Sequence, residues 1–316
     1  MWCTVMGSLR ASNCPANIPH NGPSGMASSG ISGPDFICIG MIKAGTEWLY
    51  DQLRHHPDFW MPPVKEIRYL GSKSPQMRPL TEHWQRVARA RDRGRSGKSL
   101  RDERDYEFLK EGMALRGRGS DFQNYSRLFR FKGNLLSGDI SPDYSTMGDT
   151  AVSQIAEKLP QAKIVLLVRD PVSRAWSGLS MLYRAGKFDP KVLENPDDFR
   201  AYYKSSVNAE RRSYPSRILQ RWRQYAPEMN FRHFFFDELS RDSEGTRAAI
   251  LQYLGGNSEK TSGDLPAGYN RKAEKQKLVL TEPIKAVLVD HFKDELRACA
   301  DLFGGPAKEW PARYGV

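Results

Sequence analysis

The chain has 316 residues, of which 11% are aromatic, so it can bury one large α/β core or two small ones. Lys and Arg (48) outnumber Asp and Glu (37), and the net charge of +11 favours acidic partners: nucleotides, sulfated or phosphorylated acceptors, nucleic acid or a membrane surface. No apolar run approaches the ~20 residues of a membrane-spanning helix, which excludes such a helix within this sequence.

The first predicted elements follow a tail. Residues 1–34 are rich in Ser, Gly, Asn and Pro without periodicity, and we expect them to be disordered. The unbroken apolar run at 36–41 predicts a buried parallel strand, and apolar residues at helical spacing up to residue 53 predict a helix after it. A strand that enters a helix through a glycine loop presents unpaired N–H groups and the positive end of the helix dipole, here beside Lys43. This arrangement binds anions, phosphates above all.

The next region is more polar. Alternation at residues 64–70, after two prolines, predicts a short extended segment. Between residues 72 and 132 charged residues dominate, which predicts a solvated helical insert with helices at 82–93 and 105–115. The alternative interpretation is that the insert is an acceptor-binding element or a mobile lid.

The rest of the chain alternates strands with helices. The run Lys163–Val168 is the most strand-like, and its unbroken apolarity predicts a buried parallel strand. Asp149 or Thr150 is expected to cap one helix and Asp170 the next. Alternation of this kind implies an α/β fold with a parallel sheet covered on both faces. Further strands are predicted at 134–140 and 231–236, and helices at 150–159, 171–183, 215–225, 246–254 and 284–296.

A second anion-binding turn follows the strand Lys163–Val168. In open α/β sheets ligands bind beyond the carboxyl ends of the strands, so Arg169 should face the same crevice as Lys43. Ser177 lies about two helical turns further on, where its hydroxyl can share an anion with the Arg169 guanidinium. The sequence therefore predicts one crevice built from two separated turns.

These two turns resemble a known family. Residues 43–48, with the sequence KAGTEW, resemble the 5′-phosphosulfate loop of the sulfotransferases that use 3′-phosphoadenosine 5′-phosphosulfate (PAPS). The lysine precedes the glycine, unlike the Gly-Lys-Ser/Thr ending of a Walker A loop. Arg169 and Ser177, with Asp-Pro between them, resemble the family's 3′-phosphate motif. The resemblance runs from Phe36 to the C-terminus and is weakest over 72–132.

Three further segments resemble the same family. KEIRYL at 65–70 is similar to a Lys-Glu-x-His-Phe-Phe segment, in which the glutamate is the proposed base of sugar sulfotransferases. SPDY at 141–144 is similar to a Ser/Thr-Pro-x-Tyr segment beside the acceptor. NRK at 270–272 occupies the place of the basic loop that closes over the nucleotide.

The resemblance implies a P-loop-like, three-layer α/β fold with a central parallel sheet flanked by helices, as one domain over residues 35–316. It further implies that Lys43 stabilises the leaving phosphate, that Glu66 is the base, that 3′-phosphoadenosine 5′-phosphate (PAP) is the product and that no metal takes part. The implied acceptor-binding residues are Lys65, Arg68, Asp143 and Tyr144. The implied donor-binding residues are Lys43, Ala44, Gly45, Thr46, Glu47, Trp48, Arg169, Ser177, Asn270, Arg271 and Lys272.

Several positions leave alternatives open. Trp48 is expected to stack near the adenine, but a tryptophan on an apolar helix face is at least as often core. Glu66 can act as a base or form an ion pair with a neighbouring Lys or Arg. Glu47 replaces a small hydroxyl residue and brings negative charge towards the anion site, while Arg68 and Leu70 replace histidine and phenylalanine. These departures leave the acceptor less defined than the donor.

The expected partners are therefore PAPS and a hydroxyl- or amine-bearing acceptor, with a carbohydrate as first choice because the segment at 65–70 resembles the sugar-modifying, heparan-sulfate-type branch. No nucleic acid partner is expected, and the oligomeric state is undefined. A nucleotide-dependent kinase with a P-loop-like site and a non-catalytic polyanion-binding protein are the alternative functions. Four cysteines without metal or disulfide spacing favour a reducing compartment such as the cytoplasm; they are Cys3, Cys14, Cys38 and Cys299. Without a spanning run or a signal-peptide pattern we expect a soluble protein. Since Golgi members of the resembled family carry an N-terminal membrane anchor, the resemblance implies a bacterial-like member.

Overall fold

A computed structural model describes residues 33–71, 77–92, 100–206, 212–225, 230–260 and 278–316. The predicted tail lies outside the described residues except for its last two positions. The predicted donor-binding residues Asn270, Arg271 and Lys272 also lie outside them.

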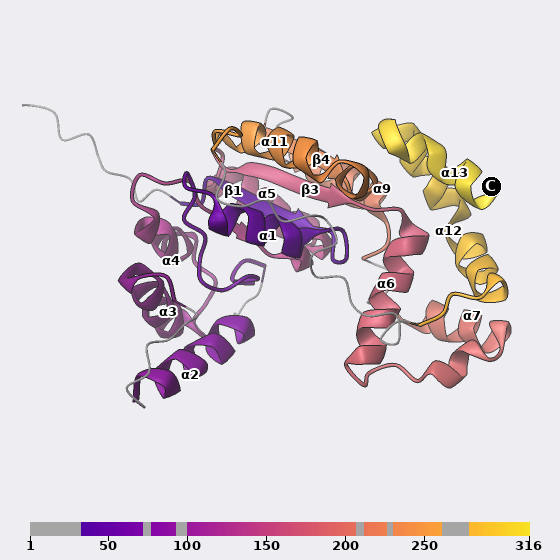
Figure 1. The fold of residues 1–316 in the computed structure, drawn as a ribbon, viewed down its shortest axis with the longest axis horizontal. Coiled ribbons are helices and arrows are strands. Elements are labelled where there is room, and N and C mark those ends of the chain that lie inside the picture. The colour runs from indigo at the N-terminus through magenta and orange to yellow at the C-terminus, as the bar shows by residue number, and fades with distance from the viewer. Residues whose placement is uncertain (1–32, 72–76, 93–99, 207–211, 226–229, 261–277) are drawn as a thin grey trace, which may run out of the picture. The chain divides into compact units, whose positions relative to one another are not determined.

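Within the described residues, four parallel strands form the central sheet, in the order β2-β1-β3-β4. They are β1 (Phe36–Gly40), β2 (Gly138–Ile140), β3 (Lys163–Val168) and β4 (Phe231–Phe235). The register pairs Phe36 with both Gly138 and Lys163. Every residue of β1 is buried, as is β3 after its first residue, because helices cover both sides of the sheet (Figure 1). The predicted α/β class with a parallel sheet is confirmed.

The helices follow the strands in chain order. None of the described helices is long and apolar enough to cross a bilayer. Their bounds are α1 (Thr46–His55), α2 (Arg78–Asp92), α3 (Glu103–Leu115), α4 (Phe122–Arg127), α5 (Asp149–Lys158), α6 (Pro171–Arg184), α7 (Pro196–Ser205), α9 (Pro215–Tyr225), α10 (Phe236–Arg241), α11 (Ser243–Leu254), α12 (Glu282–Phe303) and α13 (Trp310–Tyr314). Short 3₁₀ turns are η1 (Leu128–Lys132), η2 (Pro142–Thr146), η3 (Pro190–Leu193) and η6 (Gly305–Glu309).

Local sequence chemistry explains several element ends. The Asp170 carboxylate accepts the Ser173 amide at 2.8 Å and caps α6, as predicted. Gly255 ends α11 in the left-handed conformation, at φ 98°. The predicted cap of α5 was wrong, because Gly148 occupies that position without a side-chain bond.

The charged insert is helical as predicted, but it is not simply a solvated surface. Phe108 of α3 and Tyr125 of α4 are fully buried. The buried carboxylate of Asp105 accepts a hydrogen bond from the indole of Trp60 at 3.2 Å. Trp60 and Phe108 also meet edge to face, with ring centroids 5.8 Å apart. One side of the insert therefore belongs to the core, and the charged residue Asp105 is buried with it.

Candidate active site

The loop between β1 and α1 is tied to β3 by a backbone hydrogen bond and contains two residues in the left-handed region. The Met41 amide donates to the carbonyl of Leu167 in β3 at 2.7 Å. Lys43 and Gly45 both have positive φ angles, 70° and 97°. A Cβ atom at Gly45 would lie 2.7 Å from a Leu239 methyl, so glycine is required there on two counts. Gly45 is the N-cap residue of α1 and supplies no side-chain hydrogen bond to the first-turn amides of the helix.

The residues after the loop have different surroundings. Ala44, Thr46 and Trp48 are buried, and Trp48 lies within the hydrophobic core. Glu47 points the other way: its carboxylate is mostly exposed and pairs with the Lys65 ammonium at 3.3 Å. The charge that Glu47 brings to the helix N-terminus is therefore balanced by a neighbouring lysine.

Arg169 joins the two predicted turns. Its Nη1 donates a hydrogen bond to the Lys43 carbonyl oxygen at 3.0 Å. The guanidinium also lies 4.3 Å from the centre of the Phe236 ring, the first residue of α10. Burial lowers the pKa of Arg169, against the opposing effect of Asp170, yet the group stays cationic. A cation from the end of β3 thus contacts the backbone of the loop after β1.

The α6 side of the site is tied to the C-terminus of the chain. The Tyr314 hydroxyl of α13 donates to the Asp170 carboxylate at 2.7 Å and lies 3.2 Å from the Ser173 hydroxyl. Ser177 is half-buried in the second turn of α6. The structure therefore fixes the start of α6 through Asp170, directly after Arg169.

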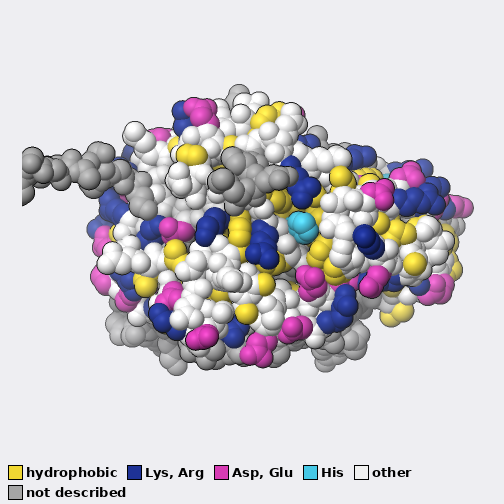
Figure 2. All heavy atoms as spheres, turned by 90° about the horizontal axis from the view of Figure 1, so that it is seen from above, with side chains coloured by type: hydrophobic (Ala, Val, Ile, Leu, Met, Phe, Trp, Pro, Cys, Tyr) yellow, Lys and Arg dark blue, Asp and Glu magenta, His cyan; other side chains and the backbone are white. Residues whose placement is uncertain are grey.

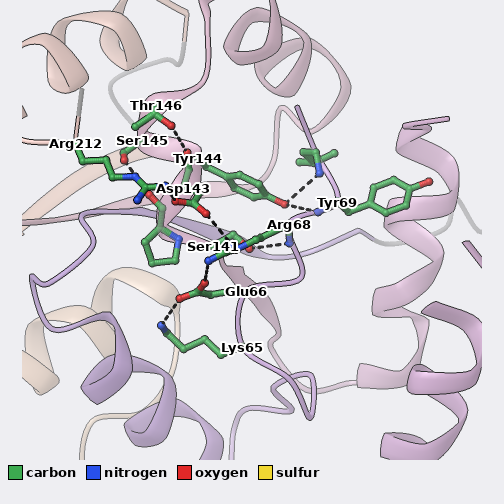
Figure 3. Close-up of polar contacts among 12 residues, drawn as sticks. Lys65, Glu66, Arg68, Tyr69, Ser141, Asp143, Tyr144, Ser145, Thr146 and Arg212 are labelled. Carbon is green, nitrogen blue, oxygen red and sulfur yellow. Dashed lines mark hydrogen bonds and ion pairs between the residues drawn. The ribbon is translucent and has the colours of Figure 1, made fainter. Parts of the chain in front are cut away.

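The segment at 64–70 differs from the predicted extended segment. It contains no strand, and Glu66 and Arg68 have positive φ angles of 65° and 52°. Glu66 pairs with Lys65 at 3.1 Å and also with the Arg68 guanidinium (Figure 3). Burial alone would raise the pKa of Glu66, but the charges of Lys65 and Arg68 outweigh it and lower the pKa. The carboxylate is held in its ionised form.

The charge pairs continue beyond Glu66. Arg68 pairs with the Asp143 carboxylate at 3.1 Å, and Arg212 pairs with the other oxygen of Asp143 at 2.7 Å. Figure 3 shows these groups pointing towards one another from three separate segments. Together with Glu47 they form an alternating series, which we call the charge ladder: Glu47, Lys65, Glu66, Arg68, Asp143 and Arg212.

Tyr144, predicted to contact the acceptor, is buried with its hydroxyl already bonded. The hydroxyl donates to Asp139 of β2 at 2.8 Å. It accepts the backbone amides of Tyr69 and Leu70 at 3.1 and 3.2 Å. In this structure the Tyr144 hydroxyl therefore binds the backbone at the end of the segment at 64–70.

Four residues at the site were missed from the sequence: Asp139, Arg212, Phe236 and Tyr314. Only Asp139 carried a local signal, an acidic residue within an otherwise apolar predicted strand. The other three reach the site through long-range contacts.

The site holds no cluster of metal-ligand residues: within the ranges that the structure covers, no three His, Cys, Asp or Glu side chains gather as for a metal ion. On the face drawn in Figure 2, basic side chains are interspersed with acidic and apolar ones. The positive charge of the chain forms no continuous basic surface on that face.

Comparison with known proteins completes the description. A model of the sulfotransferase family matches residues 34–259. A sulfotransferase structure from Alicyclobacillus acidocaldarius is similar with a TM-score of 0.56 and 17% identity, over 88% of this chain and 99% of that one. The sulfotransferase domain of an olefin synthase from Synechococcus gives 0.45 and 14%, over 82% of this chain and 95% of the domain. No curated protein matches the sequence.

Proposed function

The chain belongs to the sulfotransferase family and is a sulfuryl-transfer enzyme, and we propose that it moves the sulfuryl group of PAPS to a hydroxyl or amine of a carbohydrate or glycoconjugate. The observation that carries this proposal is the hydrogen bond between Arg169 and the Lys43 carbonyl. This bond brings the two turns together, which supports a single donor site. PAPS carries phosphates at the 3′ and 5′ positions of its ribose, so it needs cationic groups at two places.

The loop geometry supports the proposed donor site. The first-turn amides of α1 and the Thr46 hydroxyl would hold the 5′-phosphate, where the helix dipole favours an anion. Arg169 and Ser177 would hold the 3′-phosphate, with Arg271 and Lys272 as further ligands from outside the described residues. Ala44 and Gly45 would contribute backbone, and Asn270 would belong to the closing loop.

Transfer would then be an in-line displacement. The acceptor oxygen or nitrogen attacks the sulfur, and the bond between sulfur and the 5′-phosphate oxygen breaks. The electron pair leaves on that oxygen, where the Lys43 ammonium neutralises the new charge of PAP. The acceptor proton passes to Glu66, whose lowered pKa keeps it ionised and so able to accept.

The acceptor side would use the charge ladder. Arg68 contacts two carboxylates, so it can release Glu66 for the acceptor and remain paired with Asp143. Lys65 would hold the other side of Glu66. Polar, hydrogen-bonding side chains of this kind suit a hydroxylated acceptor better than an apolar phenol, which supports the choice of a carbohydrate.

Transfer of labelled sulfate from PAPS to a panel of sugars, alcohols and amines tests the proposal. We expect Lys43→Ala to lower the rate by roughly 10²–10³-fold, as for the loss of one transition-state donor. Lys293→Ala is the matched control, because Lys293 is an exposed lysine of α12 paired with Asp290 at 3.2 Å. Wild-type transfer by Lys43→Ala would reject the assigned mechanism.

A further inference from the structure

The segment of residues 66–70 holds a backbone conformation that its residues disfavour. Glu66 and Arg68 both have positive φ angles without being glycine. Such a conformation is unfavourable for residues other than glycine and persists only where the surroundings impose it. The Glu66 amide donates to the Ile140 carbonyl at 3.1 Å, but this bond alone does not fix the residues that follow.

Two side-chain hydroxyls accept hydrogen bonds from the amides of residues 68–70. The Arg68 amide donates to the Ser141 hydroxyl at 3.1 Å. The Tyr69 and Leu70 amides donate to the Tyr144 hydroxyl at 3.1 and 3.2 Å. These bonds hold the segment in a turned conformation in place of the extended one that the sequence pattern predicted.

One buried carboxylate orients both hydroxyls. Asp139, 1% exposed, accepts the Ser141 hydroxyl at 2.7 Å and the Tyr144 hydroxyl at 2.8 Å. A hydroxyl has one hydrogen and two lone pairs. Because Asp139 takes the hydrogen of Tyr144, both lone pairs of that oxygen face the two backbone amides. Asp139 therefore sets the orientation of both hydroxyl groups, because each donates its hydrogen to this carboxylate.

We propose that Tyr144 and Ser141 are positioning residues that hold the backbone around Glu66 and Arg68 in place, with the buried Asp139 orienting their hydroxyls. The proposed mechanism assigns none of these three side chains to the reacting atoms. Their effect on the backbone follows from the contacts above, whereas their effect on turnover rests on the proposed function, in which Glu66 is the base. A base displaced by a fraction of an ångström loses rate without any change at the donor site.

Two tyrosine variants separate positioning from general stability. Tyr144→Phe removes the acceptor of the two amides. Tyr125→Phe is the matched control, because the Tyr125 hydroxyl donates to the same Asp139 oxygen at 3.0 Å but is not among the acceptors of the segment's amides. Both tyrosines are buried, and the stacking of Tyr125 on Tyr69, at 5.8 Å, needs no hydroxyl.

The readouts are hydrogen exchange of the peptide spanning residues 66–70, calorimetric affinity for PAP, and kcat with an acceptor that the wild type sulfates. For Tyr144→Phe we expect exchange to speed up and kcat to fall by about tenfold or more, with the PAP affinity unchanged. For Tyr125→Phe we expect all three to stay near the wild type. If Tyr144→Phe does not fold, it is replaced by Ser141→Ala, which removes the acceptor of the Arg68 amide together with the bond from Ser141 to Asp139.

Unchanged exchange in Tyr144→Phe, or equal losses of kcat in both tyrosine variants, would overturn the positioning role. A wild-type enzyme that transfers no sulfuryl group would instead reject the proposed function. In that case the exchange comparison still decides whether the hydroxyl of Tyr144 holds the segment, so the two failures are distinguishable.

Discussion

Replacing Arg169 tests whether the two turns form one donor site. Its guanidinium donates to the Lys43 carbonyl at 3.0 Å and lies 4.3 Å from the centre of the Phe236 ring. Arg169→Ala removes the proposed 3′-phosphate ligand together with a bond that holds the phosphate loop. We therefore expect a loss of affinity for PAP that exceeds any loss of folding stability.

The magnitude follows from the interactions that are lost. A hydrogen bond to a charged group contributes about 1.5–3 kcal/mol, which corresponds to a rise in the PAP Kd of roughly 10- to 150-fold. The stacking of the guanidinium on Phe236, worth about 0.5–1 kcal/mol, is a contact within the protein, so its loss lowers folding stability and removes no contact with PAP. Arg169→Lys keeps the charge but cannot donate in two fixed directions. Its Kd for PAP should therefore lie between those of the wild type and of Arg169→Ala.

Isothermal calorimetry with PAP measures these values directly. Phe236→Leu is the matched control, because it removes the ring beside the guanidinium and leaves Arg169 itself in place. Thermal unfolding of each variant shows whether the fold is retained. An Arg169→Ala variant that is folded and binds PAP like the wild type would refute the convergence of the two turns.

Two further predictions concern acid and the core. The pKa of Glu66 in the free protein lies below its ordinary value of 4.5, so the carboxylate stays ionised as the pH falls to that value, and its contribution to turnover and stability is lost only below it. The pH profile of kcat/KM reports groups of the free enzyme, so an acid limb above 4.5 that is assigned to Glu66 in that profile would contradict this. Leu166→Ala in the central strand β3, where the side chain is fully buried, should destabilise the protein by about 2–5 kcal/mol in urea unfolding, and a cost comparable to that of a surface substitution would contradict its core position.

Much of the fold was predictable because its determinants are local. The unbroken apolar runs of β1 and β3 require burial on both faces, which specifies parallel strands between helices. Asp170 before Pro171 predicts a helix start, and the structure confirms it. The turn between β1 and α1 was predictable for the same reason, since Gly45 lies between an apolar run and a helical pattern in the sequence.

The rest depends on contacts between distant residues. Asp143 and Arg212 are 69 positions apart, and Asp170 and Tyr314 are 144 apart, so no sequence window contains either pair. The segment at 64–70 illustrates a conflict: its alternation predicts a short extended segment, but the hydroxyl of Tyr144 accepts hydrogen bonds from the amides of Tyr69 and Leu70. Tertiary hydrogen bonds here override the local pattern.

Glu47 is the departure from the family pattern that the structure explains most directly. A carboxylate at the start of α1 would repel the donor's phosphates, yet its ammonium partner, Lys65, lies 3.3 Å away. Glu47 is 58% exposed on its side chain, so this pair adds little stability and acts mainly to cancel charge. The same ammonium lies 3.1 Å from Glu66. Lys65 therefore stands between the proposed donor loop and the proposed base, so its position bears on the electrostatics of both halves of the reaction.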